Sequence, residues 1–147
     1  MVPNHLTTDL VSQVLDRDAP GIWDLVKELR LRLFATAAVR GIHIVSTTAY
    51  VVEERPWIAE IEAAVQSHGG KVHFVALRPS VETLEQRVLS ESRQNHRKLQ
   101  TVESLRAALR DADYFSPINA EDLVIDNGAL SADETAERIV AHFSLLE

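Results

Sequence analysis

A short basic segment stands out in a chain that is otherwise acidic. The 147 residues carry a formal net charge of −7, yet Arg93, Arg97 and Lys98 lie close together between about 92 and 100, opposed nearby by Glu91. Guanidinium groups form paired hydrogen bonds with phosphate oxygens, and a polar segment between two helices can close over a ligand. The pattern predicts a phosphate-binding lid. The alternative is a solvated helix end whose cations complement the helix dipole.

A second polar cluster lies near the N-terminus, directly before an apolar helical repeat. His5 and Asp9 are spaced so that they can act as a general base or orient a substrate hydroxyl. Local helix chemistry offers another interpretation, in which Thr7 and Thr8 are capping residues and Asp9 is a first-turn acid. Both interpretations stay open.

The chain contains no glycine-rich loop that would cradle phosphates. Its Gly70-Lys71 pair has Val65 where a phosphate loop needs glycine and Val72 where it needs Ser or Thr. A helix precedes the pair and a strand follows it, so we predict a turn. The six histidines show no metal-ligand spacing, and we therefore predict no metal site. No catalytic residue can be assigned.

Composition limits the classes of protein that need consideration. The chain is 46% hydrophobic and 25% charged, which is typical of a globular protein, and its length suits a single domain. It has no cysteine, no N-terminal leader pattern and no apolar run long enough to cross a bilayer, so we expect a cytoplasmic protein. The negative net charge disfavours binding to nucleic acids.

The hydrophobic pattern predicts alternating helices and strands. The expected helices cover Thr8–Leu15, Ile22 to about Gly41, Pro56–Ser67, a segment capped by Ser80, Val102 to about Asp113, and a segment capped by Ser131 and Glu134. The expected strands are Ile42–Tyr50, Val72–Leu77 and Asp122–Asp126. This alternation is typical of a parallel sheet with helices on both faces. Three strands are too few to cover so many apolar helices, so we expect that a strand is missing.

Several runs of residues occur in the same order as in one known family. They are Asn4–Asp9, Trp23–Arg30, Ser92–Leu99, Ile125–Asn127 and Leu130–Glu134. With these runs the chain resembles small bacterial P-loop kinase-like proteins, of the shikimate-kinase-like and chloramphenicol-phosphotransferase-like folds. The resemblance implies an α/β fold, a three-layer parallel sheet of P-loop kinase type that is N-terminally truncated. The first strand, the phosphate loop and the first helix of the family would lie before Met1.

The resemblance also implies roles for particular residues. Arg93, Arg97 and Lys98 would be lid residues that contact ATP phosphates. On the acceptor side, the residues facing a small molecule would be His5, Asp9 and Arg30. ATP and Mg²⁺ are the ligands expected if the full family pattern holds.

Three functional hypotheses follow. The first is a phosphotransferase that acts with ATP on a small hydroxylated acceptor and is impaired without its phosphate loop. The second is a non-catalytic α/β module that self-associates or binds a protein through a sheet edge and helix faces. The third is a phosphoryl-ligand binder that uses the basic segment alone.

Overall fold

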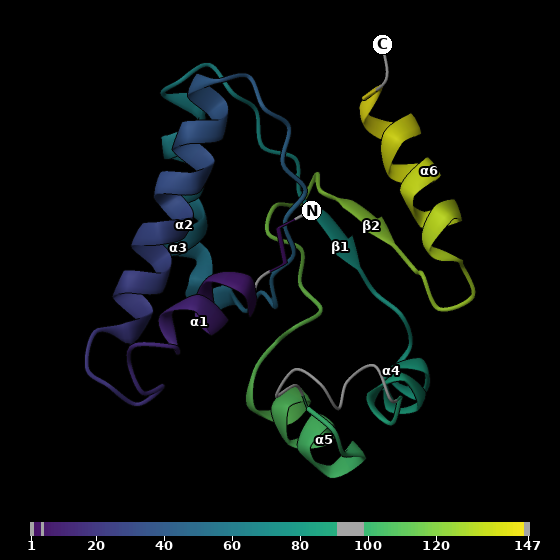
Figure 1. Cartoon of the computed structure of the whole chain (residues 1–147). Helices are drawn as coiled ribbons and strands as arrows, with labels where there is room; N and C mark the ends of the chain where they lie inside the picture. The colour runs from purple at the N-terminus through teal and green to yellow at the C-terminus, as the bar shows by residue number, and fades with distance from the viewer. Residues whose placement is uncertain (1, 4, 91–98, 146–147) are drawn as a thin grey trace. The chain divides into compact units, whose positions relative to one another are not determined.

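The computed structural model describes residues 2–3, 5–90 and 99–145. They form two compact units, Met1–Val72 and His73–Glu147, and each unit is described by itself. The first unit is helical, and the second combines helices with a small parallel sheet (Figure 1). The expectation of one domain over residues 1–147 stays a prediction.

The first unit is built around a long central helix. Its elements are α1 (His5–Val11), α2 (Ile22–Val39), the 3₁₀ turn η1 (Val52–Glu54) and α3 (Arg55–Gln66). Helix α2 packs against both α1 and α3, and Figure 1 shows α2 and α3 side by side. Arg40 follows α2, and Gly41 then adopts a positive φ of 62°, a conformation that suits a helix C-terminus.

The core of the first unit lies between α1 and α2. Val11, Ile22 and Val26 are buried together, with Leu15 and Leu29 packed around them. The α2 residues of this set are spaced by three or four positions, which places them on one helix face. Burying such a face contributes more to helix stability than intrinsic propensity does.

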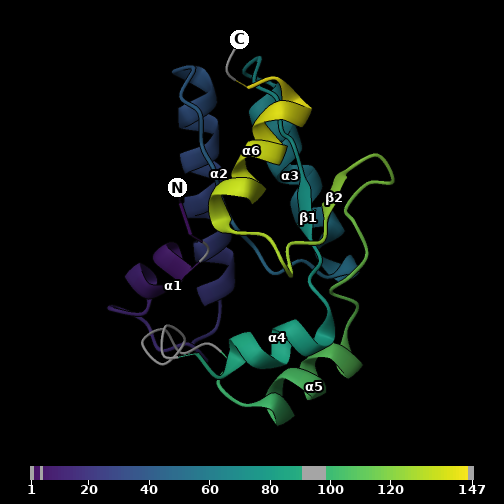
Figure 2. The same cartoon turned by 90° about the vertical axis from the view of Figure 1, so that its right-hand side faces the viewer.

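The second unit contains the parallel strand pair. Its elements are β1 (Val75–Leu77), α4 (Val81–Val88), α5 (Val102–Asp111), β2 (Leu123–Ile125) and α6 (Ala132–Phe143). Val75 lies opposite Leu123 and Leu77 opposite Ile125 in the parallel register. Figure 2 shows the two strands side by side, and α6 contacts β2.

Two helix N-termini in this unit match the sequence predictions. The Ser80 hydroxyl accepts a hydrogen bond from the Thr83 amide at 3.2 Å and caps α4. At α6, Ser131 Oγ accepts from the Glu134 amide at 3.1 Å, and Glu134 Oε2 accepts from the Ser131 amide at 2.7 Å. This reciprocal pair confirms the predicted capping box.

The expected three-layer parallel sheet of P-loop kinase type, N-terminally truncated, is wrong. The molecule is mostly helical, and the described residues contain only one two-stranded sheet. The physical reason is that a β-branched segment becomes a strand only when a neighbour completes its ladder. Ile42–Tyr50 was predicted to be a strand, but its described pairing is a single parallel bridge between Ser46 and Val2.

The first helix also differs from its prediction. It spans His5–Val11 instead of Thr8–Leu15, so Thr7 and Thr8 lie inside the helix and do not cap it. Their hydroxyls instead accept hydrogen bonds from a side chain of α2, which competes successfully with local capping.

Candidate functional site

The predicted lid cannot be placed. Arg93, Arg97 and Lys98 lie outside the described residues, so their predicted contact with phosphate stays a prediction. The described helices on either side of this segment are α4 and α5, which contact one another.

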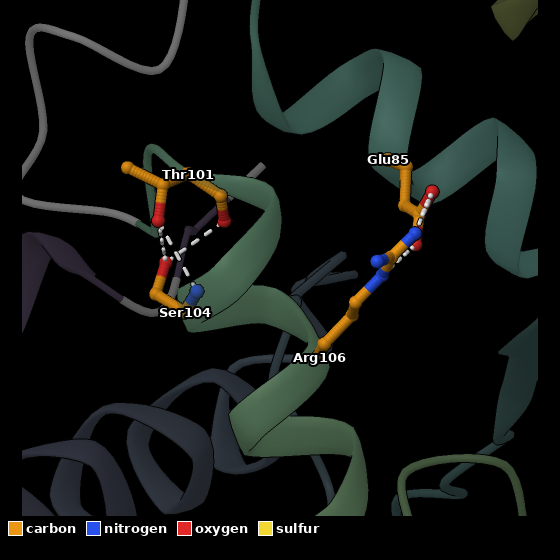
Figure 3. Close-up of polar contacts among 4 residues, drawn as sticks. All are labelled: Glu85, Thr101, Ser104 and Arg106. Carbon is orange, nitrogen blue, oxygen red and sulfur yellow. Dashed lines mark hydrogen bonds and ion pairs between the residues drawn. The ribbon is translucent and has the colours of Figure 1, made fainter.

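An ion pair joins α4 to α5. Arg106 on α5 donates from Nε to Glu85 Oε1 at 2.6 Å and from Nη2 to Glu85 Oε2 at 3.1 Å (Figure 3). The hydrogen bond to Glu85 raises the pKa of Arg106. At the start of α5, Thr101 Oγ1 accepts from the Ser104 amide at 3.1 Å and caps the helix (Figure 3). These contacts fix how the two helices pack and leave both side chains of the ion pair engaged with each other.

Arg87, in the last turn of α4, bonds to the backbone of another segment. Its Nη2 donates to the Asn127 carbonyl at 2.8 Å and reaches the Gly128 carbonyl at 3.5 Å. A guanidinium that bonds two successive carbonyls ties α4 to the loop after β2. Arg87 therefore supports this loop.

The N-terminal cluster is centred on Arg30 of α2. Arg30 Nε donates to Thr7 Oγ1 at 2.7 Å, and Nη2 donates to Thr8 Oγ1 at 3.2 Å. Burial lowers the pKa of Arg30, and the nearby Glu54 carboxylate acts in the opposite direction. Since Thr8 is buried, these bonds satisfy a hydroxyl that is shielded from water.

The other two predicted acceptor-side residues lie on α1. His5 is half-buried at the first position of the helix. Asp9 is exposed, and its backbone carbonyl accepts from Gln13 Nε2 at 3.5 Å. The structure thus brings Arg30 to Thr7 and Thr8, and the acceptor role of His5, Asp9 and Arg30 stays a prediction.

A second polar cluster lies where the two parallel strands end. Arg78 follows β1 directly, and its amide donates to the Ile125 carbonyl at 2.8 Å, which extends the ladder. Asp126 and Asn127 follow β2. Because parallel strands present their carboxyl ends at the same edge, these side chains come to one edge, where ligands bind in open α/β sheets. We call Arg78, Thr83, Asp126 and Asn127 the carboxyl-end site.

The loop after β2 is held close to the first turn of α4. Asp126 Oδ1 accepts from the Gly128 amide at 2.8 Å. A Cβ atom added to Gly128 would lie 3.1 Å from Asp126 Oδ1 and 3.4 Å from Thr83 Oγ1. Glycine therefore lets the loop approach α4 closely and brings Thr83 to the site.

Two buried polar atoms of the carboxyl-end site lack a hydrogen-bond partner among the described residues. They are Arg78 Nε, a donor, and Asn127 Oδ1, an acceptor. A buried polar group without a partner costs roughly 1–3 kcal/mol, so its persistence needs an explanation. The Arg78 charge does act on Asp113, whose pKa is lowered first by the Ser116 hydroxyl and then by backbone amides, with Arg78 adding to the effect.

The sequence predictions did not include the carboxyl-end site. The available signal was position: Arg78 and Asn127 each follow a short apolar strand, at the end where parallel sheets bind ligands. The basic residues between about 92 and 100 led the prediction to a neighbouring segment instead. Within the part of the chain that is described, no three His, Cys, Asp or Glu side chains lie together so as to hold a metal ion.

None of the described helices is both long enough and apolar enough to cross a bilayer. Comparison with known proteins gave no match to any protein-family model, curated protein or solved structure.

Proposed function

We propose that the unit His73–Glu147 binds a nucleotide or a related phosphorylated small molecule at the carboxyl-end site. The observation that carries this proposal is the buried pair of polar atoms, Arg78 Nε and Asn127 Oδ1, which have no partner among the described residues. Ligand-binding sites typically combine a few convergent polar groups of this kind with an edge of a parallel sheet.

The chemistry of the two atoms restricts the ligand. The Arg78 donor fits a phosphate or carbonyl oxygen, and a guanidinium suits a phosphate group in both charge and geometry. The Asn127 acceptor fits an amino or hydroxyl group. A nucleotide carries all of these groups. Asp126, the carboxylate at this edge, would assist Mg²⁺, which is usually held by one or two carboxylates together with substrate phosphates.

Phosphoryl transfer from ATP to a small hydroxylated acceptor remains a hypothesis beyond this binding proposal. We assign no nucleophile or base for that reaction. Phosphoryl transfer can be tested in the titrations described below by also measuring whether ATP loses its γ-phosphoryl group.

The proposal is tested by isothermal titration of the full chain with ATP, ADP, adenosine and tripolyphosphate, with and without Mg²⁺. We expect ATP and ADP to bind, and Asn127→Ala to weaken binding about tenfold or more, which corresponds to the loss of roughly 1.4 kcal/mol. This substitution keeps the backbone carbonyl that accepts from Arg87. Arg78→Gln should weaken the binding of tripolyphosphate more than the binding of adenosine, because the substitution removes the positive charge of Arg78.

Arg110→Gln is the matched control, since Arg110 is an exposed arginine at the end of α5. Its affinity for ATP should equal that of the unmodified chain. Absence of any heat of binding and of any shift in melting temperature at millimolar ATP would reject the proposal. Equal weakening by Arg78→Gln and Arg110→Gln would show that general charge, and not the carboxyl-end site, attracts the nucleotide.

A further inference from the structure

The peptide that joins Asn127 to Gly128 is held at both of its polar groups. Arg87 Nη2 donates to the Asn127 carbonyl at 2.8 Å and comes within 3.5 Å of the Gly128 carbonyl. Asp126 Oδ1 accepts from the Gly128 amide at 2.8 Å. In a planar trans peptide the C=O and N–H groups point in opposite directions, so the two side chains hold this peptide from opposite sides. Its orientation is therefore fixed.

The fixed peptide adjoins the residue that supplies the acceptor of the carboxyl-end site. Asn127 Oδ1 is buried and lacks a hydrogen-bond partner among the described residues. The Asn127 side chain branches from the Cα atom next to this peptide, so a change in the backbone angles at that atom would move Oδ1. Gly128 belongs to the same arrangement, because an added Cβ would lie 3.1 Å from Asp126 Oδ1. The local contacts of the loop thus keep Asn127 in place.

Arg87 connects this loop to α4. It lies in the last turn of α4, a helix of eight residues. A helix this short is marginal by itself and depends on tertiary contacts. The contacts that hold α4 include the buried Val88 side chain and the Glu85–Arg106 ion pair. The bond from Arg87 to the loop is a further one, so the end of α4 and the loop after β2 stabilise each other.

We propose that Arg87 is the positioning residue of the carboxyl-end site and couples the last turn of α4 to ligand binding there. The inference rests on the proposed function, since it concerns the affinity of that same site. Arg87 acts through Asn127: its guanidinium binds the backbone carbonyl, while the ligand meets Asn127 Oδ1. Coupling between two parts of a protein is reciprocal. A bound nucleotide therefore holds the last turn of α4, and displacement of that turn weakens binding.

A double-mutant cycle measures whether Arg87 acts through Asn127. Arg87→Met keeps an apolar stem and removes the hydrogen bond to the loop. Titration of the full-length variant with ATP should show a severalfold loss of affinity. Arg87→Lys retains a cationic donor and should recover part of that loss. In the Asn127→Ala background, Arg87→Met should weaken ATP binding by less than about twofold further, because effects on one shared contact do not add.

The side-chain amide resonances of Asn127 in the ligand-free chain report on its position directly. They are identified by their loss from the NMR spectrum of Asn127→Ala. They should shift in Arg87→Met and stay in place in Arg110→Met, the matched control, which removes an exposed arginine from the end of α5. ATP should also slow amide exchange in the last turn of α4 in the unmodified chain, and should do so less in Arg87→Met.

Failure of the coupling and failure of the proposed function give different results. If the unmodified chain binds no ATP, the proposed function is rejected, and this inference with it. If the chain binds ATP, three results overturn the coupling alone. They are equal affinity of Arg87→Met and the unmodified chain, unmoved Asn127 resonances in Arg87→Met, and an undiminished effect of Arg87→Met in the Asn127→Ala background. The last result would show that Arg87 contacts the ligand itself.

Discussion

The Arg30 guanidinium lies half-buried against α1, where it donates to the hydroxyls of Thr7 and Thr8 at 2.7 and 3.2 Å. One cation thereby joins two helices of the first unit. The same geometry limits what Arg30 can offer to a ligand, because at least two of its five donors are already engaged. At the scale of single residues, its role in holding α1 on α2 is the one that the contacts support.

Replacing Arg30 tests this structural role. Arg30→Met keeps the apolar stem but removes both bonds and leaves the buried Thr8 hydroxyl without its donor. We expect the free energy of unfolding, measured by urea titration, to fall by about 1–3 kcal/mol. The matched control is Arg32→Met on the same helix, where the exposed pair with Glu28 contributes about 0–1 kcal/mol. Equal effects of the two substitutions would contradict the assignment.

At the scale of elements, α6 has the best-defined start. Hydrogen bonding from the Ser131 amide, followed by the Ser131 hydroxyl, lowers the pKa of Glu134. A carboxyl group with a lowered pKa in the folded state binds its proton more weakly there than in the unfolded chain. It therefore stabilises the fold above its unfolded pKa of about 4.3 and loses this contribution as the pH falls through the lower, folded value.

Glu134→Gln separates the contribution of Glu134 to the pH dependence of stability from the contributions of the other carboxyl groups. Glutamine can complete the same box but does not ionise in this range. We expect the melting temperature of the unmodified chain to fall more steeply than that of the variant between about pH 5 and pH 3. Asp113 and Glu82 also have lowered pKa values, but they titrate alike in both proteins. Parallel melting curves would show that Glu134 contributes nothing to the pH dependence.

The helices could be predicted from the sequence wherever local chemistry decides them. Pro56 lies in the first turn of α3, Ser80 caps α4, and Ser131 with Glu134 caps α6, as expected. These features depend on residues within one turn of each other. The segment Ile42–Tyr50 failed as a strand because its pairing depends on a partner far away in the chain, and β-branched composition does not supply that partner.

The polar sites were harder to predict for the same reason. Thr7 and Thr8 matched the pattern of capping residues, but Arg30, more than twenty positions later, binds their hydroxyls. Arg78 and Asn127 become neighbours only through the pairing of β1 with β2. Sequence spacing alone gave no reason to associate them, whereas the clustered basic residues near Arg93 were conspicuous by composition.

At the scale of the whole molecule, buried apolar side chains occur in both units. Val11, Ile22 and Val26 centre the first unit. In the second, the buried apolar side chains include Val88, Leu105 and Ile125. Small cores supply little stability, so binding of a ligand should raise the melting temperature measurably. The proposed binding therefore has a consequence for stability as well.

The division into two cores is itself testable by amide hydrogen exchange. Val26 has no exposed surface, so Val26→Ala should cost roughly 1–3 kcal/mol and reduce protection mainly in α1, α2 and α3. Leu105→Ala should reduce protection mainly in the second unit. If each unit has a core of its own, the two substitutions give complementary patterns along the chain. If both substitutions lower protection equally throughout, the chain unfolds as one cooperative domain, as its length alone predicts.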